Sequence, residues 1–395
     1  MSSTVFREDI IAYLARYLGR KYAEKLLESV TTPGTRYFFR VNTLKTKPED
    51  LLHELRSQGV NVYQHAHVPE ALFVPVEGPF EIRRLDKVVY VDKHTAESVY
   101  VGANVFAPGV YKVENAEKGD YVSVISPNGI LVAEGILEME PDEIFSKRRG
   151  LAVRVTRSVY KAQSFRDTSY FLSGHIYHQS LPSMVAVRLL DPKPGETILD
   201  MCASPGGKST HAAQLMENTG EIIAVDRSKS KVDTVLENAK RLGINIIKGV
   251  VYDSRYISEV LGKESVDAVI LDPPCSALGV RPKLYYDRSY QDIVKLANYQ
   301  RQFIREAVNV LRRGGKLLYT TCTFSPLENE LNVVHAFSDF GLTPVPISFP
   351  SIKTPLLGIP GLQFDPHLHD TPGFFISILV KKWHPSCQIH AKKLK

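Results

Sequence analysis

The pattern of apolar and polar positions divides the chain into three parts, and the first part mixes helix and strand. Residues 5–30 carry apolar side chains at helical spacing, which predicts a helix that ends before Pro33 and Gly34. The elements expected next are a strand over residues 37–43, a helix over 48–58 and a short strand near 60–63. This order predicts a small α+β unit, to which we assign residues 1–87.

The second part, residues 88–164, consists of short apolar runs divided by turns. The runs lie at residues 88–91, 105–107, 121–125, 130–133 and 151–155. Asn128 and Gly129 stand between two of these runs, and an Asn-Gly pair in that position is a strong hairpin signal. Closely spaced strands of this kind predict a small β-barrel.

The third part, residues 165–395, alternates apolar strands with helical stretches. The strands are expected at residues 198–199, 222–225, 246–247, 268–271, 316–319 and 374–380. Near-continuous apolar strands that alternate with helices are typical of a parallel sheet buried on both faces. The pattern therefore predicts an α/β domain with a Rossmann-like sheet, preceded by the α+β unit and the barrel.

A glycine-rich turn marks the ligand-binding corner of that sheet. The strand that ends at Asp200 runs into Pro205, Gly206 and Gly207 and then into a helix. Such a corner binds nucleoside or phosphate groups, because a ligand can approach a backbone that lacks Cβ atoms. The dehydrogenase fingerprint G-x-G-x-x-G is absent, and the spacing of a P-loop is not met. The turn thus indicates a nucleoside-like ligand, with a plain tight turn as the alternative.

Three carboxylates follow successive strands and should converge on one crevice. Asp226 lies about 20 residues past the glycine turn, where an acid takes ribose hydroxyls, and it can also cap the next helix. Asp253 follows the third strand, where it can accept from an adenine amino group, and Asp272 follows the fourth. The set suits S-adenosylmethionine, which has two hydroxyls, an exocyclic amine and a positive centre. ATP is disfavoured, because carboxylates without a phosphate cradle would repel it.

Two cysteines give the sheet its candidate chemistry. Asp272 and Cys275 flank two prolines that hold the backbone extended after a strand. Cys322 follows the next predicted strand, so we expect the two thiols to lie close together. Either cysteine alone reads as a small buried residue, but their joint placement behind strands favours a chemical role. The four cysteines form no C-x-x-C pair, so neither a zinc site nor any other metal is expected.

A thiol pair of this kind fits methylation of cytosine at carbon 5. That carbon is a poor nucleophile, and a thiolate that adds to carbon 6 turns the ring into an enamine whose carbon 5 is nucleophilic. A carboxyl group near N3 and N4, for which Asp272 is the candidate, stabilises the charge that develops. Loss of the carbon-5 proton and β-elimination then free the thiol. The chemistry alone does not choose between the two cysteines as nucleophile.

Charge and composition add a pointer to nucleic acid. The net charge of +6 is a mild basic excess that is compatible with RNA. Arg40 and Asn42 alternate along a predicted strand and so share a face, which makes them candidate RNA contacts, with a solvated strand face as the alternative. No apolar run approaches the ~20 residues of a membrane helix, and no secretory stretch is present. We expect a soluble, cytoplasmic protein without a membrane partner, and a monomer.

As a set, the motifs resemble those of the Nol/Nop/Sun family of RNA cytosine-C5 methyltransferases. The match comprises Arg40-Val-Asn42, Gln179 to Ser183, Asp200 to Lys208, Asp226, Asp253, Asp272-Pro-Pro-Cys275, Thr321-Cys322 and Gly373-Phe374-Phe375. The resemblance implies that Cys322 is the covalent nucleophile and that Cys275 assists product release. It implies a site for S-adenosylmethionine made of Cys202, Ala203, Ser204, Pro205, Gly206, Gly207, Lys208, Asp226, Asp253 and Asp272. Ser204 stands where many members carry alanine; both residues are small.

The barrel resembles a PUA domain, which binds RNA, and the N-terminal unit is similar to an RNA-recognition or ferredoxin-like unit. The PUA resemblance rests on residues 102–110 and on the turn at residues 118–120. The RNA contacts that it implies are Gly102, Ala103, Asn104, Phe106, Pro108 and Gly109. A PUA domain ahead of the catalytic domain resembles the subfamily that methylates tRNA at the acceptor-stem cytosine next to the discriminator base, with the barrel holding the CCA end.

Three other interpretations stay open at this point. The same chemistry could act on ribosomal RNA. A non-catalytic RNA-binding assembly factor could keep the cofactor fold, but it would have no need of the cysteine pair. An exocyclic-amine methyltransferase should retain activity when both thiols are removed.

Overall fold

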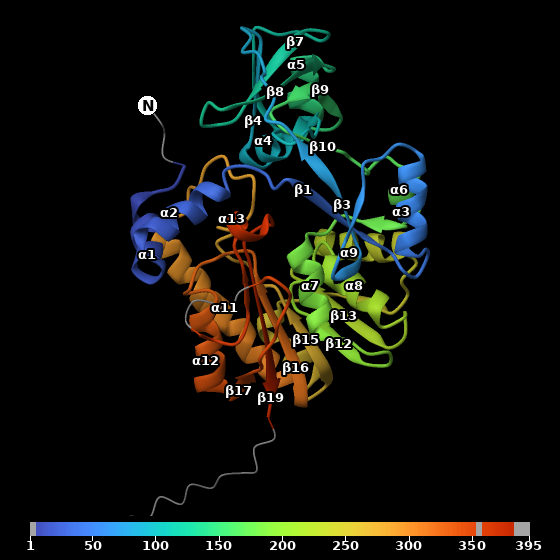
Figure 1. Cartoon of the computed structure of the whole chain (residues 1–395), viewed down its shortest axis with the longest axis vertical. Helices are drawn as coiled ribbons and strands as arrows, with labels where there is room; N and C mark the ends of the chain where they lie inside the picture. The colour runs from blue at the N-terminus through green and yellow to red at the C-terminus, as the bar shows by residue number, and fades with distance from the viewer. Residues whose placement is uncertain (1–4, 353–357, 383–395) are drawn as a thin grey trace, which may run out of the picture.

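The computed structural model describes residues 5–352 and 358–382, which form three sheets with helices around the largest one (Figure 1). The first two helices are α1 (Glu8–Leu18) and α2 (Arg20–Ser29), where the pattern predicted one. Gly19 separates them because its φ of 78° lies outside the helical region. Both helices pack in one apolar cluster with Leu278, Ile293 and Phe324, so they lie against the largest sheet domain.

The N-terminal sheet is completed by residues that follow the barrel in the chain. Its strands are β1 (Arg36–Val41), β2 (Tyr63–His65), β3 (Val68–Glu77), β10 (Lys161–Ala162) and β11 (Ile176–Tyr177), with α3 (Pro48–Ser57) packed beside β3. β10 pairs with β3, and β11 pairs with β1. Phe165 is buried with Phe39 in the core of this unit, ahead of α6 (Ser169–Leu172). The predicted boundary at residue 165 therefore falls inside a segment that returns to the N-terminal sheet.

The second unit, at the top of Figure 1, is a six-stranded sheet around its own apolar core. Its elements are β4 (Val88–Val91), α4 (Lys93–Val99), β5 (Val105–Phe106), a 3-10 turn (Ala107–Gly109), β6 (Val110–Glu114), β7 (Tyr121–Ile125), β8 (Leu131–Leu137), α5 (Pro141–Lys147) and β9 (Leu151–Ser158). All five predicted runs form strands. β6 is the strand that the pattern missed, because Tyr111 and Lys112 are exposed and interrupt its apolar run.

The largest sheet has eight strands, and most of them are parallel. They are β12 (Thr197–Asp200), β13 (Glu221–Asp226), β14 (Ile247–Val251), β15 (Val266–Leu271), β16 (Leu311–Thr321), β17 (Leu342–Pro344), β18 (Leu362–Phe364) and β19 (Phe374–Lys381). Their order is β14-β13-β12-β15-β16-β19-β17, with β18 beside β19. β19 runs antiparallel to β16, β17 and β18, so the expected parallel sheet is mixed at one edge.

Helices cover both faces of this sheet. They are α7 (Leu181–Leu190), α8 (Gly207–Leu215), α9 (Lys229–Leu242), α10 (Ser258–Leu261), α11 (Tyr290–Val310) and α12 (Glu330–Phe340). The short α13 (Pro366–His369) lies against α2 instead. Successive side chains of a strand point to opposite faces: Ile198 packs in the cluster that contains α7, and Leu199 in the cluster that contains α11. In the part of the chain that the structure describes, no helix has the length and apolar composition needed to cross a membrane.

The strand order reverses between β12 and β15. From β12 the chain builds outward through β13 to β14, and it then crosses back to β15 on the other side of β12. Open α/β sheets bind their ligands at the carboxyl ends of the strands where this reversal occurs. Asp200 ends β12 and Asp272 follows β15, so both lie at this crevice.

Replacing Phe165 with alanine should destabilise the protein, although the residue follows the barrel in the chain. Its side chain is 1% exposed, and its ring centroid lies 4.8 Å from that of Phe39. Truncating a buried phenylalanine costs about 3–5 kcal/mol of unfolding free energy. Urea unfolding followed by circular dichroism should show this loss. Phe145→Ala, on the surface of α5, is the control and should cost less than about 0.5 kcal/mol; equal losses would contradict a core role for Phe165.

Candidate active site

A cavity of about 210 Å³ lies at the point of strand reversal. The predicted cofactor residues that line it are Cys202, Ala203, Ser204, Pro205, Gly207, Lys208 and Asp272. Gly206, Asp226 and Asp253 lie outside its lining. The structure therefore brings together the glycine turn and one of the three predicted carboxylates.

The glycine turn presents backbone to the cavity and starts α8. Gly206 is the N-cap residue of α8 and has a φ of 101°, a conformation that favours glycine. A Cβ on Gly207 would lie 3.3 Å from the ring of Tyr177, so that wall is closely packed. The free N–H groups and the positive dipole end at the start of α8 suit a carboxylate or another anion.

Asp200 is a buried carboxylate on the cavity wall. Its side chain accepts a hydrogen bond from the Ser209 hydroxyl at 2.6 Å. Burial raises the pKa of Asp200 to about 6, because the charged form is poorly solvated. Sequence reasoning placed Asp200 at the ligand edge but gave it no role.

Lys208 and Asp272 form an ion pair inside the cavity. Burial alone would lower the pKa of Lys208, but the carboxylates of Asp272 and Asp200 outweigh that effect and raise it. Lys208 therefore stays charged at neutral pH. The other oxygen of Asp272 accepts from the Thr320 hydroxyl at 3.0 Å, so the carboxylate is fixed between β15 and β16.

The other two predicted carboxylates are engaged by their own neighbours. Asp226 accepts from the backbone N–H of Ser228 at 3.2 Å, and the ammonium of the exposed Lys231 lies 3.8 Å away. The guanidinium of Arg255 binds Asp253 with a shortest distance of 2.6 Å and holds the pKa of that carboxyl below its usual range. Within the described residues, His, Cys, Asp and Glu side chains form no cluster of three that could hold a metal ion.

The two thiols of interest lie side by side. The sulfur atoms of Cys275 and Cys322 are 3.1 Å apart, which confirms the expected proximity. The hydrogen bond with Cys322 and burial raise the pKa of the Cys275 thiol well above its usual value. Cys275 therefore keeps its proton at neutral pH. Asp272 and Cys275 follow β15, and Cys322 follows the neighbouring parallel strand β16. The two thiols and the carboxylate therefore share one edge of the sheet.

Comparison with known proteins decides the family. A family model described as 16S rRNA methyltransferase RsmB/F matches residues 187–380, a PUA model matches 87–159, and a model of the ferredoxin-like domain of RsmF/B-like enzymes matches 11–81. The tRNA (cytosine(72)-C(5))-methyltransferase of Pyrococcus horikoshii is 43% identical over 383 residues, which cover 95% of this chain and 97% of that protein. This chain is a member of the Sun family of RNA cytosine-C5 methyltransferases.

Other relatives agree with the assignment. The human tRNA (cytosine(72)-C(5))-methyltransferase NSUN6 is 32% identical over 84% of this chain and 78% of its own length. A crystal structure of NSun6 from Pyrococcus horikoshii with SFG has 42% identity and a TM-score of 0.88, and it covers 96% of this chain and 99% of that chain. The predicted Rossmann-like domain, α+β unit and PUA domain of this methyltransferase are thereby confirmed.

Residues behind the thiols hold both cysteine turns in place. The backbone N–H of Ser276 donates to the Glu328 carboxyl at 2.7 Å, and the Ser276 and Thr323 hydroxyls are 2.8 Å apart. Thr321 donates to the side chain of Asn329 at 2.5 Å. Glu328 and Asn329 are fully buried. These contacts of Glu328 and Asn329 were not predicted from the sequence, because a Glu-Asn pair at the start of a helix is typical of an ordinary helix cap.

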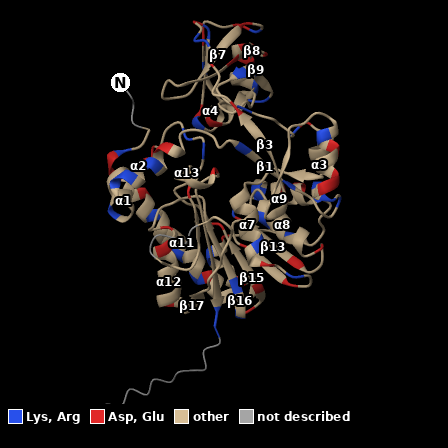
Figure 2. Ribbon diagram, in the orientation of Figure 1, with Lys and Arg blue, Asp and Glu red and all other residues tan. Residues whose placement is uncertain are grey.

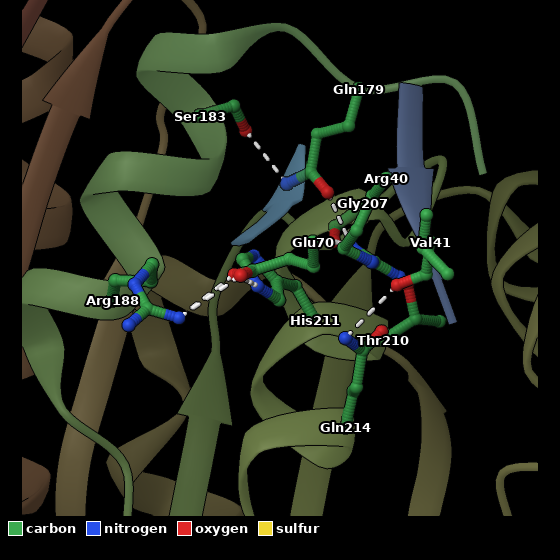
Figure 3. A network of polar contacts seen from close by, with 10 residues as sticks. All are labelled: Arg40, Val41, Glu70, Gln179, Ser183, Arg188, Gly207, Thr210, His211 and Gln214. Atoms are coloured by element: carbon green, nitrogen blue, oxygen red, sulfur yellow. Dashed lines mark hydrogen bonds and ion pairs between the residues drawn. The ribbon is translucent and has the colours of Figure 1, made fainter. Parts of the chain in front are cut away.

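Arg40 and Asn42 are buried, so their predicted role as RNA contacts is wrong, as is the alternative of a solvated face. Arg40 is 1% exposed and donates to the Gly207 carbonyl and the Thr210 hydroxyl, each at 2.9 Å (Figure 3). Asn42 donates to the backbone carbonyls of Gly174 and Leu242. Both side chains join the N-terminal sheet to the methyltransferase domain. Burial lowers the pKa of Arg40 to about 10, which leaves it charged.

A second set of polar contacts lies next to Arg40 in Figure 3. Glu70 of β3 accepts from His211 at 2.9 Å and from Arg188 at 3.0 Å. Burial lowers the pKa of His211 to about 4, so the ring is neutral and donates through Nε2. Gln214 donates to the Val41 carbonyl at 3.1 Å. Polar contacts thus fasten β1 to α8, and β3 to both α7 and α8.

A further part of the cavity wall comes from β11, the residues after it and the start of α7, which the sequence analysis did not assign to the site. This part consists of Tyr177, His178, Gln179, Ser180 and Ser183. Neither ring nitrogen of His178 has a hydrogen-bond partner within the described residues. Gln179 links this wall to Arg40 and donates to Ser183 at 3.1 Å. The resemblance of the motif from Gln179 to Ser183 to the family was the sequence signal that could have placed this segment in the site.

The six predicted RNA contacts of the PUA domain differ in exposure. Ala103, Asn104, Phe106 and Pro108 are exposed, and the Phe106 side chain is 56% exposed. Gly109 is instead buried, and a Cβ there would lie 2.0 Å from the Thr95 hydroxyl, so its role is packing and the predicted contact is wrong. Figure 2 shows both signs of charge on α1, α2 and α3, so the net positive charge is not gathered on these helices.

Asp200→Asn should remove a pH dependence of stability. The pKa of Asp200 is raised from 3.8 to about 6 in the fold, so the folded state holds this proton more tightly than the unfolded chain. Wild-type stability should therefore fall as the pH rises from 4 to 7, by about 2 kcal/mol for this group.

Urea unfolding at both pH values measures the difference between wild type and Asp200→Asn. Groups other than Asp200 titrate in both proteins and cancel in this comparison, as does any constant cost of the substitution. An identical change of stability with pH in the two proteins would contradict the raised pKa.

Proposed function

We propose that this protein transfers a methyl group to carbon 5 of a cytosine in the acceptor stem of tRNA, next to the discriminator base, with Cys322 as the covalent nucleophile. The observation that carries the proposal is the pair of sulfur atoms 3.1 Å apart beside Asp272. A scaffold protein or an exocyclic-amine methyltransferase has no need of such a pair.

The proton of Cys275 supports the assignment of the two cysteines. Cys275 keeps its proton at neutral pH and can donate it to the neighbouring sulfur. The Cys275 S–H and the ammonium of Lys208 both lie near the Cys322 sulfur. Cys322 forms a bond to carbon 6 of cytosine, and its lone pair supplies the electrons that make carbon 5 nucleophilic.

Asp272 and Lys208 fit the remaining demands of the reaction. The Asp272 carboxylate, oriented by Lys208 and Thr320, accepts a hydrogen bond from the N4 amino group of the base. The Lys208 ammonium beside it offsets the negative charge that develops on the ring. Cys275 assists the last stage, in which the carbon-5 proton passes to a water molecule. The electrons of that C–H bond then form the double bond between carbons 5 and 6, and the bond between carbon 6 and Cys322 breaks. The electrons of that bond return to the Cys322 sulfur.

The cavity fits S-adenosylmethionine, which supplies an electrophilic methyl group when bound. The start of α8 suits its carboxylate, and the acidic wall of Asp200 and Asp272 suits a cationic ligand. Asp226 is the proposed partner of the ribose hydroxyls, and Asp253 is free for an adenine only when it exchanges its contact with Arg255. SFG, present in the related crystal structure, is an S-adenosylmethionine analogue, which supports this cofactor.

The relatives support the choice of tRNA. The Pyrococcus, mouse and human proteins named tRNA (cytosine(72)-C(5))-methyltransferase match over most of this chain, including the PUA domain. The Bacillus subtilis protein named probable ribosomal RNA small subunit methyltransferase B matches over 54% of it. The Arabidopsis rRNA (cytosine-C(5))-methyltransferase NOP2C covers 93% of it but at 26% identity, against 43% for the Pyrococcus tRNA enzyme. The exposed Phe106 side of the PUA domain is proposed to hold the CCA end.

Nucleoside mass spectrometry tests the reaction and the substrate together. Unmodified tRNA and ribosomal RNA are each incubated with the protein and S-adenosylmethionine. We expect 5-methylcytidine in tRNA, and mapping should place it in the acceptor stem. Methylation of ribosomal RNA alone would move the proposal to that substrate, and a methylated exocyclic amine would end the thiol mechanism.

Cys322→Ser should abolish methylation while cofactor binding persists. A serine hydroxyl is a far weaker nucleophile than a thiolate at neutral pH, so we expect a loss of at least about a thousandfold in kcat. Calorimetric titration with sinefungin should give a dissociation constant within about twofold of wild type. Cys387→Ser, which changes a cysteine outside every motif of the sequence, is the control and should retain activity. Substantial activity of Cys322→Ser would exclude Cys322 as nucleophile.

Cys275→Ala should trap the covalent protein–RNA adduct. Without the second thiol, addition of Cys322 and methyl transfer proceed, but release of the product stalls. A slowly migrating band on a denaturing gel, present with tRNA and S-adenosylmethionine, measures the adduct. The band should vanish in the double variant that also carries Cys322→Ser. A Cys275→Ala protein that turns over at the wild-type rate without a band would rule out the release role.

A further inference from the structure

One segment of the methyltransferase domain reaches from the catalytic thiols into the PUA domain. We call residues 276–289 the thiol loop; it leaves Cys275 and leads to α11. Within it Leu284 is 3% exposed and belongs to the apolar core of the PUA domain, together with side chains of β4, β7, β8 and β9. A catalytic-domain residue thus completes the core of another domain.

Polar contacts fasten the same point of the thiol loop to the PUA domain. The backbone N–H of Leu284 donates to Glu97 of α4 at 3.3 Å, and its carbonyl accepts from Asn128 at 3.1 Å. Lys93 of α4 lies 3.4 Å from the carboxylate of Asp287. The amide and the carbonyl of one residue are therefore both held by the PUA domain.

The two ends of the thiol loop hold the backbone of both catalytic cysteines. Arg288 donates to the carbonyl of Cys275 at 2.8 Å. The N–H of Gly279 donates to the carbonyl of Cys322 at 3.0 Å. The buried Tyr286 hydroxyl donates to the carbonyl of Ser276, the residue after Cys275, at 3.1 Å.

We propose that the thiol loop is a positioning device through which the PUA domain sets the geometry of the Cys275–Cys322 pair, with Leu284 and Arg288 as its positioning residues. Leu284 anchors the loop in the PUA core, and Arg288 transmits that anchor to Cys275. RNA bound on the PUA domain and the thiols that react with its cytosine are thereby held in one rigid frame. The consequence for catalysis rests on the proposed function; the geometric consequence for the thiols does not.

Disulfide formation between the two thiols measures their geometry without RNA. Diamide takes two electrons and two protons from a thiol pair as the S–S bond forms, so its rate reports how often the sulfurs meet. Mass spectrometry of Cys275- and Cys322-containing peptides follows this bond. Loss of one hydrogen bond corresponds to about a three- to tenfold change in population. We expect Arg288→Ala and Leu284→Ala to slow the reaction by that factor.

Matched variants separate positioning from loss of stability. Arg288→Lys keeps a donor and should recover part of the rate, and Leu284→Met keeps the buried volume and should recover most of it. Leu137→Ala truncates a PUA core residue at the far end of β8 and should weaken that domain while the rate stays within about twofold of wild type.

Methylation kinetics provide the second measurement. With tRNA, Arg288→Ala and Leu284→Ala should lower kcat and lengthen the life of the covalent adduct, while KM for S-adenosylmethionine is unchanged. Oxidation rates equal to wild type in both variants, equal slowing by Leu137→Ala, or no disulfide in the wild type would overturn the proposal. Slowed oxidation in a protein that never methylates RNA would uphold the positioning device and refute the proposed function.

Discussion

The buried guanidinium of Arg40 is the contact on which the assembly of the active site depends. A charged group without water is costly to bury unless its N–H groups are satisfied. Arg40 of β1 finds its acceptors on Gln179, ahead of α7, and on Gly207 and Thr210 of α8. Its two terminal nitrogens find these acceptors only when β1, Gln179 and α8 are all in place, while its Nε has no hydrogen-bond partner among the described residues. Since Gly207 also lines the cavity, docking of the N-terminal sheet and formation of the cofactor turn are one event.

The cofactor crevice also contains ionisable side chains whose burial is only partly compensated by the residues around them. Asp200 has a raised pKa because its burial outweighs the Ser209 hydroxyl, the Lys208 charge and one weak backbone contact, which favour the ionised form. The half-buried Asp272 carboxylate forms an ion pair with the Lys208 ammonium. The Cys275 thiol keeps its proton because burial and its hydrogen bond with Cys322 raise its pKa. Each arrangement destabilises the fold while the site is unliganded, and it becomes favourable when a cationic ligand or a nucleobase occupies the site. The apolar side chains that pack on both faces of the sheet supply the folding free energy that offsets this destabilisation.

The sequence predicted correctly those contacts that follow from the order of the strands in a sheet. It did not predict the contacts that depend on how the domains pack against one another. The proximity of Cys275 and Cys322 follows from two neighbouring parallel strands that end at one edge. For Arg40, strand alternation shows which residues share a face but not what covers that face. Phe165 and Leu284 each belong to the core of a unit other than the one that their position suggests. No periodicity within a window of residues carries that information, because the partners lie more than a hundred residues away in the chain.

The way the PUA domain is inserted explains why a third attachment is needed. The chain leaves β3 at Glu77 and re-enters at Lys161 in β10, and these two residues are paired in the N-terminal sheet. Two connections at neighbouring points form a hinge, about which the inserted domain could swing. A contact far from that hinge removes this freedom, and Leu284 provides it at the loop that holds both cysteines. The PUA domain and the reacting sulfur are thereby kept at a fixed separation, as the proposed hold of the PUA domain on the CCA end requires.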